Sequence, residues 1–508
     1  MSSQEHNSLA RHRIPLEIVA EIGQWLDGKT LLAALQVSKT WFRIHYPILW
    51  NSLTERQWSH PQFPFNERMG KDGGIAILSK YQRFLPLVRH LELPAAEPHS
   101  IYRQEVAARL LLLQSILKQT RNLRSLALRV KWWYGQGVSY AADLLHFPHL
   151  KSLKVNAADF TYKRDNGDTL LLISRLEELT LTQRSTDVHF KSTTDAFFRG
   201  CDESSLPPLA VWEMRKLRIS LEDMAMLRYC PKLTELEIKL DPGRVRLPPQ
   251  AMIACPDLKV LRITTQGRDG GYNFSDLAEP FRSLKNLKTL LLPIRHLDQI
   301  EPLCLREDDQ DVSSEGNTQI LPDLEHLEMS DVLLTLSVAM TDHLHKLLVN
   351  ILQTRPLLKT LIFRGHEVKP WQLFAQPGSV CENEWRCSAL ETLDLHFTWR
   401  LYTRPKDERR EQWRSVFRQI GKLPKLKNLS ILCDGLEKSS EAGILELEGA
   451  RGLKCLELCD RQGPLWTKDE IVTLLRVVPG LVSLSLSPTS NPKQIANWVK
   501  ETGRDILK

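Results

Sequence analysis

The sequence predicts an α/β fold in which a short all-helical module precedes a solenoid of repeats with a parallel sheet on its concave face. Three observations lead to this prediction. The pattern Leu-x-x-Leu-x-Leu, with conservative replacements, recurs fourteen times between residues 88 and 486. A proline stands two residues before eight of these copies, and apolar patterns of helical period lie between several of them.

Each copy of the pattern predicts a short strand. Its last two apolar positions are two residues apart, which is typical of a strand with one buried face. Such a strand is too short to be stable alone, so it must pair with the strand of the next repeat. The steps between copies vary from 19 to 38 residues, which predicts an irregular array. The copies begin at Val88, Leu123, Leu150, Leu176, Met214, Leu233, Leu258, Leu287, Leu324, Leu358, Leu390, Leu426, Leu453 and Leu481.

Amphipathic helices are expected between the strands, because apolar residues recur there at spacings of three and four. The prolines separate helix from strand, since proline cannot continue a helix and favours extended backbone before it. Four predicted apolar helix faces are Val106/Leu110/Leu113/Leu117, Leu344/Leu347/Leu348/Ile351, Trp413/Val416/Phe417/Ile420 and Ile471/Leu474/Leu475/Val478.

Residues 14–50 lack the strand pattern and are richer in apolar residues than the rest of the chain. They predict three short helices. The first begins at Pro15, the second is capped by Thr30, and the third is capped by Ser38 and closed by Pro47. A unit of about 40 residues rarely buries enough surface to fold alone. Its core should therefore be completed by the solenoid, which such a module would cap, or by another protein.

Three segments of this module resemble the F-box family: Ile14–Ile18, Val37–Trp41 and Pro47–Trp50, with Ile14 where that family usually has Leu. The repeats resemble leucine-rich repeats, and the Cys-Pro-x-Leu segments at Cys230 and Cys255 resemble those of F-box proteins. The asparagine that follows the strand in many leucine-rich repeats is mostly missing. The expected domains are a polar tail (1–13), the F-box-like module (14–50), a linker or cap (51–85) and the solenoid (86–508).

The resemblance implies a non-catalytic substrate-recognition subunit of a Skp–cullin–F-box ubiquitin ligase. Its partners would be a Skp-type adaptor, through it a cullin, and a protein target. Trp41, Leu49 and Trp50 would pack inside the module. The residues that the resemblance places on the adaptor-docking face are Ile14, Pro15, Glu17, Ile18, Ile22, Leu26, Leu31, Leu32 and Val37.

The target should meet the side chains that lie beside the leucines of each strand and point toward the concave face. These side chains are basic toward the N-terminal half and acidic toward the other end, where Glu328, Asp394 and Glu457 occur. The basic part suits an acidic or phosphorylated target, although ordinary surface alternation would give a similar pattern. The predicted basic target-binding residues are Arg129, Lys154, Arg218 and Arg262.

Composition excludes several other classes of function. The net charge of +7 is spread among interleaved acids and bases, which argues against a nucleic-acid binder. No apolar stretch predicts a membrane span or a signal peptide, so a cytoplasmic or nuclear location with reduced cysteines is expected. No catalytic, metal or cofactor motif stands out. The alternatives left open are an adaptor-independent interaction scaffold and a regulator such as a GTPase activator built on leucine-rich repeats.

Overall fold

A computed structural model of the chain divides it into two compact units, residues 1–214 and residues 215–508, which are described separately below. The structure describes residues 15–26, 28–53, 82–93, 114–128, 144–156, 166–182, 212–220, 227, 229–240, 254–265, 281, 283–292, 321–330, 348–364, 385–397, 406–433, 443–460, 466–487 and 492–502.

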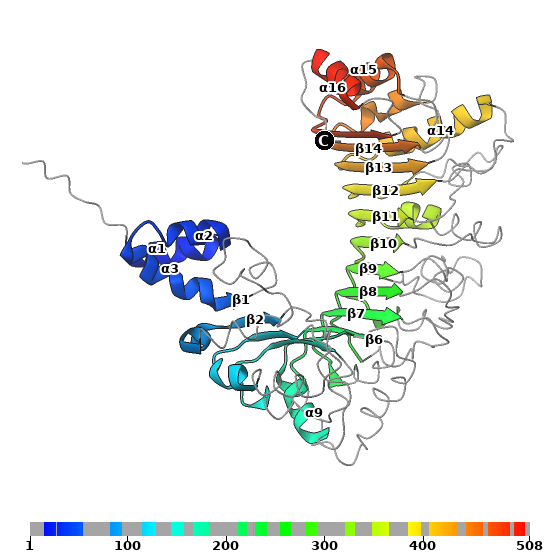
Figure 1. Ribbon diagram of the computed structural model, residues 1–508. Helices are drawn as coiled ribbons and strands as arrows, with labels where there is room; N and C mark the ends of the chain where they lie inside the picture. The colour runs from blue at the N-terminus through cyan, green and yellow to red at the C-terminus, as the bar shows by residue number, and fades with distance from the viewer. Residues whose placement is uncertain are drawn as a thin grey trace, which may run out of the picture. The chain divides into compact units, whose positions relative to one another are not determined.

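The first unit begins with three helices: α1 (Leu16–Trp25), α2 (Gly28–Ala34) and α3 (Lys39–Asn51). The three predicted helices are therefore present (Figure 1). The predicted cap of α3 is confirmed, because the side chain of Ser38 accepts a hydrogen bond of 3.1 Å from the backbone N–H of Trp41. The predicted cap of α2 is wrong: that helix begins at Gly28, so Thr30 lies inside it.

Helix α3 also continues past Pro47, where the sequence predicted its end. Proline inside a helix removes a backbone hydrogen bond and costs about 3 kcal/mol or more. The residues that follow offset this cost, since Leu49 and Trp50 are each buried in the last turn. Tertiary burial therefore overrides the local preference of the proline.

The strands of the first unit are parallel and pair in chain order. The first is a two-residue strand that follows α3 directly and that the repeat pattern did not predict. A 3₁₀ helix, η1 (Gln82–Leu87), and helix α9 (Asn166–Arg175) precede the second and the fifth strand. The strands are β1 (Ser52–Leu53), β2 (His90–Leu93), β3 (Ser125–Leu128), β4 (Ser152–Asn156) and β5 (Glu178–Thr182).

The second unit continues the same architecture with ten more parallel strands in chain order (Figure 1). Residue-to-residue pairing is even, so that each motif position lies beside its counterpart in the next strand. The predicted α/β class with parallel strands in sequence order is thus confirmed. The strands are β6 (Lys216–Ser220), β7 (Glu235–Leu240), β8 (Val260–Thr265), β9 (Thr289–Leu292), β10 (His326–Ser330), β11 (Thr360–Arg364), β12 (Thr392–Phe397), β13 (Asn428–Cys433), β14 (Cys455–Asp460) and β15 (Ser483–Ser487).

A tight turn opens the repeats that carry the predicted proline. The backbone N–H of Leu233 donates to the carbonyl of Cys230 at 3.1 Å, and Leu258 repeats the bond to Cys255 at 3.2 Å. The proline is the second residue of this turn, the position that its fixed φ favours. The cysteines that open these two turns are buried free thiols.

One backbone carbonyl then joins each repeat of the second unit to the next. The carbonyl of Glu325 accepts bonds from the N–H groups of Lys359 and Thr360, at 2.7 and 3.0 Å. The carbonyl of Lys359 accepts in the same way from Glu391 and Thr392, at 2.8 and 3.0 Å. Within the strand that follows, every second residue is buried, as the burial pattern of β10 and β11 shows.

Helices cover the buried side of the strands where the structure describes them. In α14 (Lys406–Gly421) the predicted face of Trp413, Val416, Phe417 and Ile420 is buried, which confirms it. The face of α15 (Lys468–Val477) is confirmed too, and Thr467 caps that helix in a capping box with Glu470. For the other two predicted faces, the structure describes helix only over 114–119 and 348–354. The remaining elements are η9 (Ile444–Gly449) and α16 (Pro492–Glu501).

Candidate interaction surfaces

The helical module exposes large apolar side chains on one side of α1. Ile18, Ile22 and Trp25 recur at a spacing of three and four residues, so they share one helix face. Trp25 is 83% exposed and Ile18 is 48% exposed. The neighbouring face of α1, with Val19 and Gly23, is buried. We call the exposed apolar residues the module patch; they are Leu16, Ile18, Ile22, Trp25, Val37 and Phe42.

Most of the predicted docking residues lie on the surface, and one does not. Pro15, Glu17, Ile18, Ile22 and Val37 are exposed, and Leu26 is half-buried.

Leu31 is only 4% exposed, so its side chain belongs to the core of the module and not to its docking face. Ile14 and the side chain of Leu32 lie outside the described residues. The docking prediction did not include Leu16, Trp25 or Phe42, although the helical spacing from Ile18 to Trp25 was a signal for Trp25.

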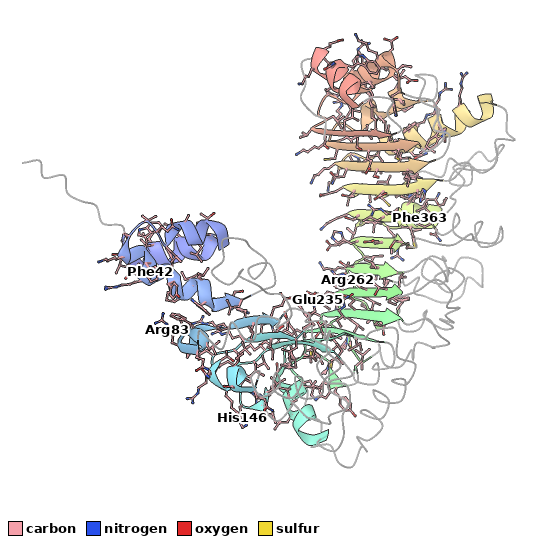
Figure 2. All side chains as sticks on the ribbon, viewed as in Figure 1. Phe42, Arg83, His146, Glu235, Arg262 and Phe363 are labelled. Carbon is pink, nitrogen blue, oxygen red and sulfur yellow. The ribbon has the colours of Figure 1, made fainter. Side chains whose placement is uncertain are left out.

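An aromatic cluster holds α3 against η1. Tyr46 stacks on Phe42 with ring centroids 4.7 Å apart and meets Phe84 of η1 edge-on at 5.0 Å. Trp50 stacks on the same Phe84 at 4.7 Å, and the guanidinium of Arg83 lies 4.5 Å above that ring. Figure 2 labels Phe42 and Arg83 at the two ends of this cluster. The burial of Leu49 and Trp50 agrees with the prediction that they pack inside, while Trp41 is half-buried.

A buried histidine lies between α1 and α3. His45 is fully buried, its ring meets that of Trp41 at 4.9 Å, and neither of its nitrogens has a hydrogen-bond partner among the described residues. Burial lowers its pKa from the ordinary value. The imidazole is therefore neutral at pH 7 and acts as a space-filling ring against Gly23.

The side chains between the two buried residues of each strand form a second candidate surface. In the second unit they lie side by side in register, and we call them the central row. Its members, from β6 to β15, are Arg218, Glu237, Arg262, Leu291, Glu328, Ile362, Asp394, Ser430, Glu457 and Ser485.

The structure brings two of the four predicted basic residues together. Arg218 and Arg262 stand on either side of Glu237 in the central row (Figure 2 labels Arg262). Arg218 is already engaged, because its guanidinium lies 3.0 Å from a carboxylate oxygen of Glu237. Lys154 is half-buried in the first unit, and Arg129 lies outside the described residues. The free positive charge here is thus smaller than the sequence pattern suggested.

The acidic part of the central row contains one buried carboxylate. Asp394 is only 6% exposed and accepts a hydrogen bond of 2.8 Å from Nε of Arg364, which stands on the neighbouring strand. That hydrogen bond raises the pKa of Arg364, and the carboxylates of Glu328 and Glu457 act on it in the same direction. All three carboxylates therefore favour the charged form of the same guanidinium.

A separate series of ion pairs runs along the residues that immediately precede the strands, which we call the entry row. Glu325 binds the Nζ atoms of Lys288 at 2.8 Å and Lys359 at 2.5 Å, and Glu391 binds Nζ of Lys427 at 2.8 Å. The hydrogen bonds from the two lysines lower the pKa of Glu325 to about 2. Signs alternate from Lys288 to Lys427, so the two acids of this row are each paired with lysines.

Within the described residues, no group of three or more His, Cys, Asp or Glu side chains is placed to hold a metal ion. Cys455 and Cys459, the only two cysteines that share a strand in the described part of the chain, are both half-buried on the face of β14 that also carries Glu457. Cys381 and the acidic run 307–311 lie outside the described residues. Burial raises the pKa of the Cys387 thiol to about 12, which leaves it protonated and unreactive.

No helix in the described part of the chain has the length and apolar character needed to cross a membrane. Comparison with models of known protein families finds no match, and comparison with curated protein sequences finds no relative.

Proposed function

We propose that the chain is the substrate-recognition subunit of a Skp–cullin–F-box type ubiquitin ligase. In this proposal the helical module docks a Skp-type adaptor, and through it a cullin, while the strands present a protein target. The chain itself has no catalytic step to perform. It would work in the cytoplasm or the nucleus, where such ligases assemble.

The module patch is the observation that supports this proposal most directly. Six large apolar side chains, each more than a third exposed, belong to a module of fewer than 40 residues. Large apolar side chains gathered on the surface of one small domain favour a site of protein interaction. Ile18 and Ile22 also coincide with positions that the resemblance to the F-box assigns to adaptor docking.

The contact between α3 and η1 favours a second candidate, an adaptor-independent interaction scaffold. Trp50 and Phe84 join the module to the first strands of its own unit, as a cap of the sheet would. A cap, however, has no need of apolar side chains on the far side of α1. The two candidates therefore differ in one respect, which is whether the module patch binds another chain.

A paired substitution on the module patch tests this difference. In Ile18→Glu/Ile22→Glu, two carboxylates replace apolar side chains that are already exposed, so the fold should persist. Truncation at an interface centre costs about 2 kcal/mol or more per residue. We expect the affinity for a purified Skp-type adaptor to fall by about 100-fold or more, measured by biolayer interferometry on the full chain.

The matched control is Leu171→Glu/Val482→Glu, which places the same charges on exposed apolar residues outside the module. Binding by the control and not by the test variant supports adaptor docking. Equal binding by both variants would show that the module patch does not dock the adaptor, and no binding by the unsubstituted chain would favour the scaffold. Circular dichroism spectra that match those of the unsubstituted chain verify that the variants are folded.

A further inference from the structure

The central row changes its charge along the second unit. Over β6–β8 it contains Arg218, Glu237 and Arg262, so bases are in excess. Over β9–β14 it contains Glu328, Asp394 and Glu457 and no base. Arg364 is the only Lys or Arg that the described strands β9–β14 place on this face. The face of β9–β14 therefore has three carboxylates and one guanidinium.

That guanidinium is already in use within the fold. Arg364 donates to Asp394, whose carboxylate is buried, so the charges of this pair cancel even though the arginine side chain is 61% exposed. Glu328 is half-exposed and Glu457 is exposed. These two carboxylates leave the face with a surplus of two negative charges. A cationic partner would gain from both, while an anionic partner would be repelled.

Apolar side chains accompany the first of the two carboxylates. Glu328 stands in register between Leu291 of β9 and Ile362 of β11. Both aliphatic side chains are half-exposed. Neighbouring strands are about 4.8 Å apart, so the three side chains form one continuous strip about 10 Å long. Such a strip suits a basic residue with an aliphatic neighbour, because long basic side chains also bury their methylene stems on apolar surface.

The distance between the two carboxylates limits the shape of the partner. Glu328 lies on β10 and Glu457 on β14, four strand steps apart, which corresponds to about 19 Å. An extended chain advances about 3.3 Å per residue, so this distance corresponds to about six residues. Two basic side chains about six residues apart in an extended segment would reach both carboxylates at once.

We infer that the face of β9–β14 binds an extended protein segment with two basic residues about six positions apart and an aliphatic residue beside one of them. This inference names the chemical class of the target and, as a statement about a target, rests on the proposed function. It differs from the expectation from sequence, which placed an acidic or phosphorylated target on Arg218 and Arg262. The pairing of Arg218 with Glu237 weakens that basic site.

A selection experiment tests the inference on the full chain. A random library of 12-residue peptides is selected on immobilised protein at about 0.15 M salt, where exposed charges more than about 8 Å apart are largely screened. We expect enrichment of peptides with Lys or Arg six positions apart. For a selected peptide, Glu328→Gln/Glu457→Gln should weaken binding by about tenfold or more, measured by fluorescence anisotropy.

The matched control is Glu325→Gln/Glu391→Gln, which removes the same two charges from the entry row. Those carboxylates are held by lysines and lie outside the central row, so this variant should bind within about twofold of the unsubstituted chain. Equal losses in both variants would mean attraction by net charge alone and would overturn the inference. Enrichment of acidic peptides, or no enrichment, would overturn it as well.

The adaptor measurement separates this inference from the proposed function. Adaptor capture without selective peptide binding would leave the ligase proposal standing and remove the basic-segment inference. Selective peptide binding without adaptor capture would support the basic-segment inference and favour the adaptor-independent scaffold over the ligase subunit. The variants of the two experiments share no residue, so one result does not determine the other.

Discussion

His45 and Gly23 show how one residue pair determines the packing of the helical module. A Cβ atom on Gly23 would lie 2.3 Å from Nδ1 of His45 and 2.9 Å from Cδ1 of Ile48. Neither distance is compatible with normal packing, and the imidazole is fully buried. The glycine is therefore needed for the close approach of α1 to α3. Its location in the middle of a helix would otherwise be unfavourable.

Replacement of this glycine should reverse the usual effect of alanine in a helix. Helix propensity alone predicts that Gly23→Ala gains up to about 1 kcal/mol. Overpacking in a filled core costs about 1–3 kcal/mol, so we expect a net loss of stability in the module. The measurement is amide hydrogen exchange over residues 16–51. Gly480→Ala is the control, because there the added Cβ would meet its nearest atom at 3.5 Å. Unchanged or slower exchange in Gly23→Ala would contradict this account.

The strands show the same dependence on neighbours that are distant in sequence. Arg364 and Asp394 form an ion pair between β11 and β12 in which the carboxylate is buried. Lys427 and Glu391 form an ion pair between neighbouring repeats in which the two side chains are 47% and 40% exposed. Buried and exposed pairs differ in what the loss of one partner leaves behind. Only the first pair should matter much for stability.

We expect Arg364→Met to destabilise the second unit by about 1–3 kcal/mol, because it leaves a buried carboxylate without its hydrogen-bond donor. The matched variant Lys427→Met should change stability by less than about 1 kcal/mol. Urea unfolding, followed by hydrogen exchange in β11–β13, measures both. The explanation fails if the two variants are equally stable, or if Lys427→Met is the more damaging.

Much of the strand architecture was predictable, because the spacing of two between buried residues such as Leu327 and Met329 is a local signal. The continuation of α3 beyond Pro47 was not, since it depends on the burial of Trp50. The burial of Leu31 was not predictable either. The sequence pattern of a short helix is the same whether its apolar residue packs in the core of the module or contacts a partner protein. The pairing of Arg364 with Asp394 joins residues 30 positions apart, which no periodicity within one repeat can reveal.

For the whole molecule, the titrating groups predict an order of acid unfolding. The pKa of His45 in the folded module is below its ordinary value of 6.5, so protonation favours the unfolded module as the pH falls below 6.5. The pKa of Glu325 is about 2 against an ordinary 4.5, and that of Glu391 is also lowered by Lys427. Their stabilisation is complete above pH 4.5 and is lost as the pH falls toward 2.

We therefore expect the helical module to loosen at a higher pH than the strands of the second unit. Hydrogen exchange corrected for intrinsic rates should accelerate in α1 and α3 between pH 6.5 and 5. Strands β9–β13 should keep their protection until the pH is below 4.5. The variant His45→Gln should lack the first step. Exchange in α1 and α3 that is the same at pH 7.5 and pH 5 would show that His45 does not control this opening.

The shared backbone carbonyl has a consequence for how the chain tolerates changes of length. Leu217 pairs with Leu236, 19 residues later, and Leu290 pairs with Leu327, 37 residues later, yet the register is the same. In the second unit each repeat is aligned with the next by its opening turn and by the two N–H groups that follow, whatever the number of residues between the strands. Segments of very different length can therefore be inserted between one strand and the next turn, or grafted from another protein, while the register of the strands is preserved.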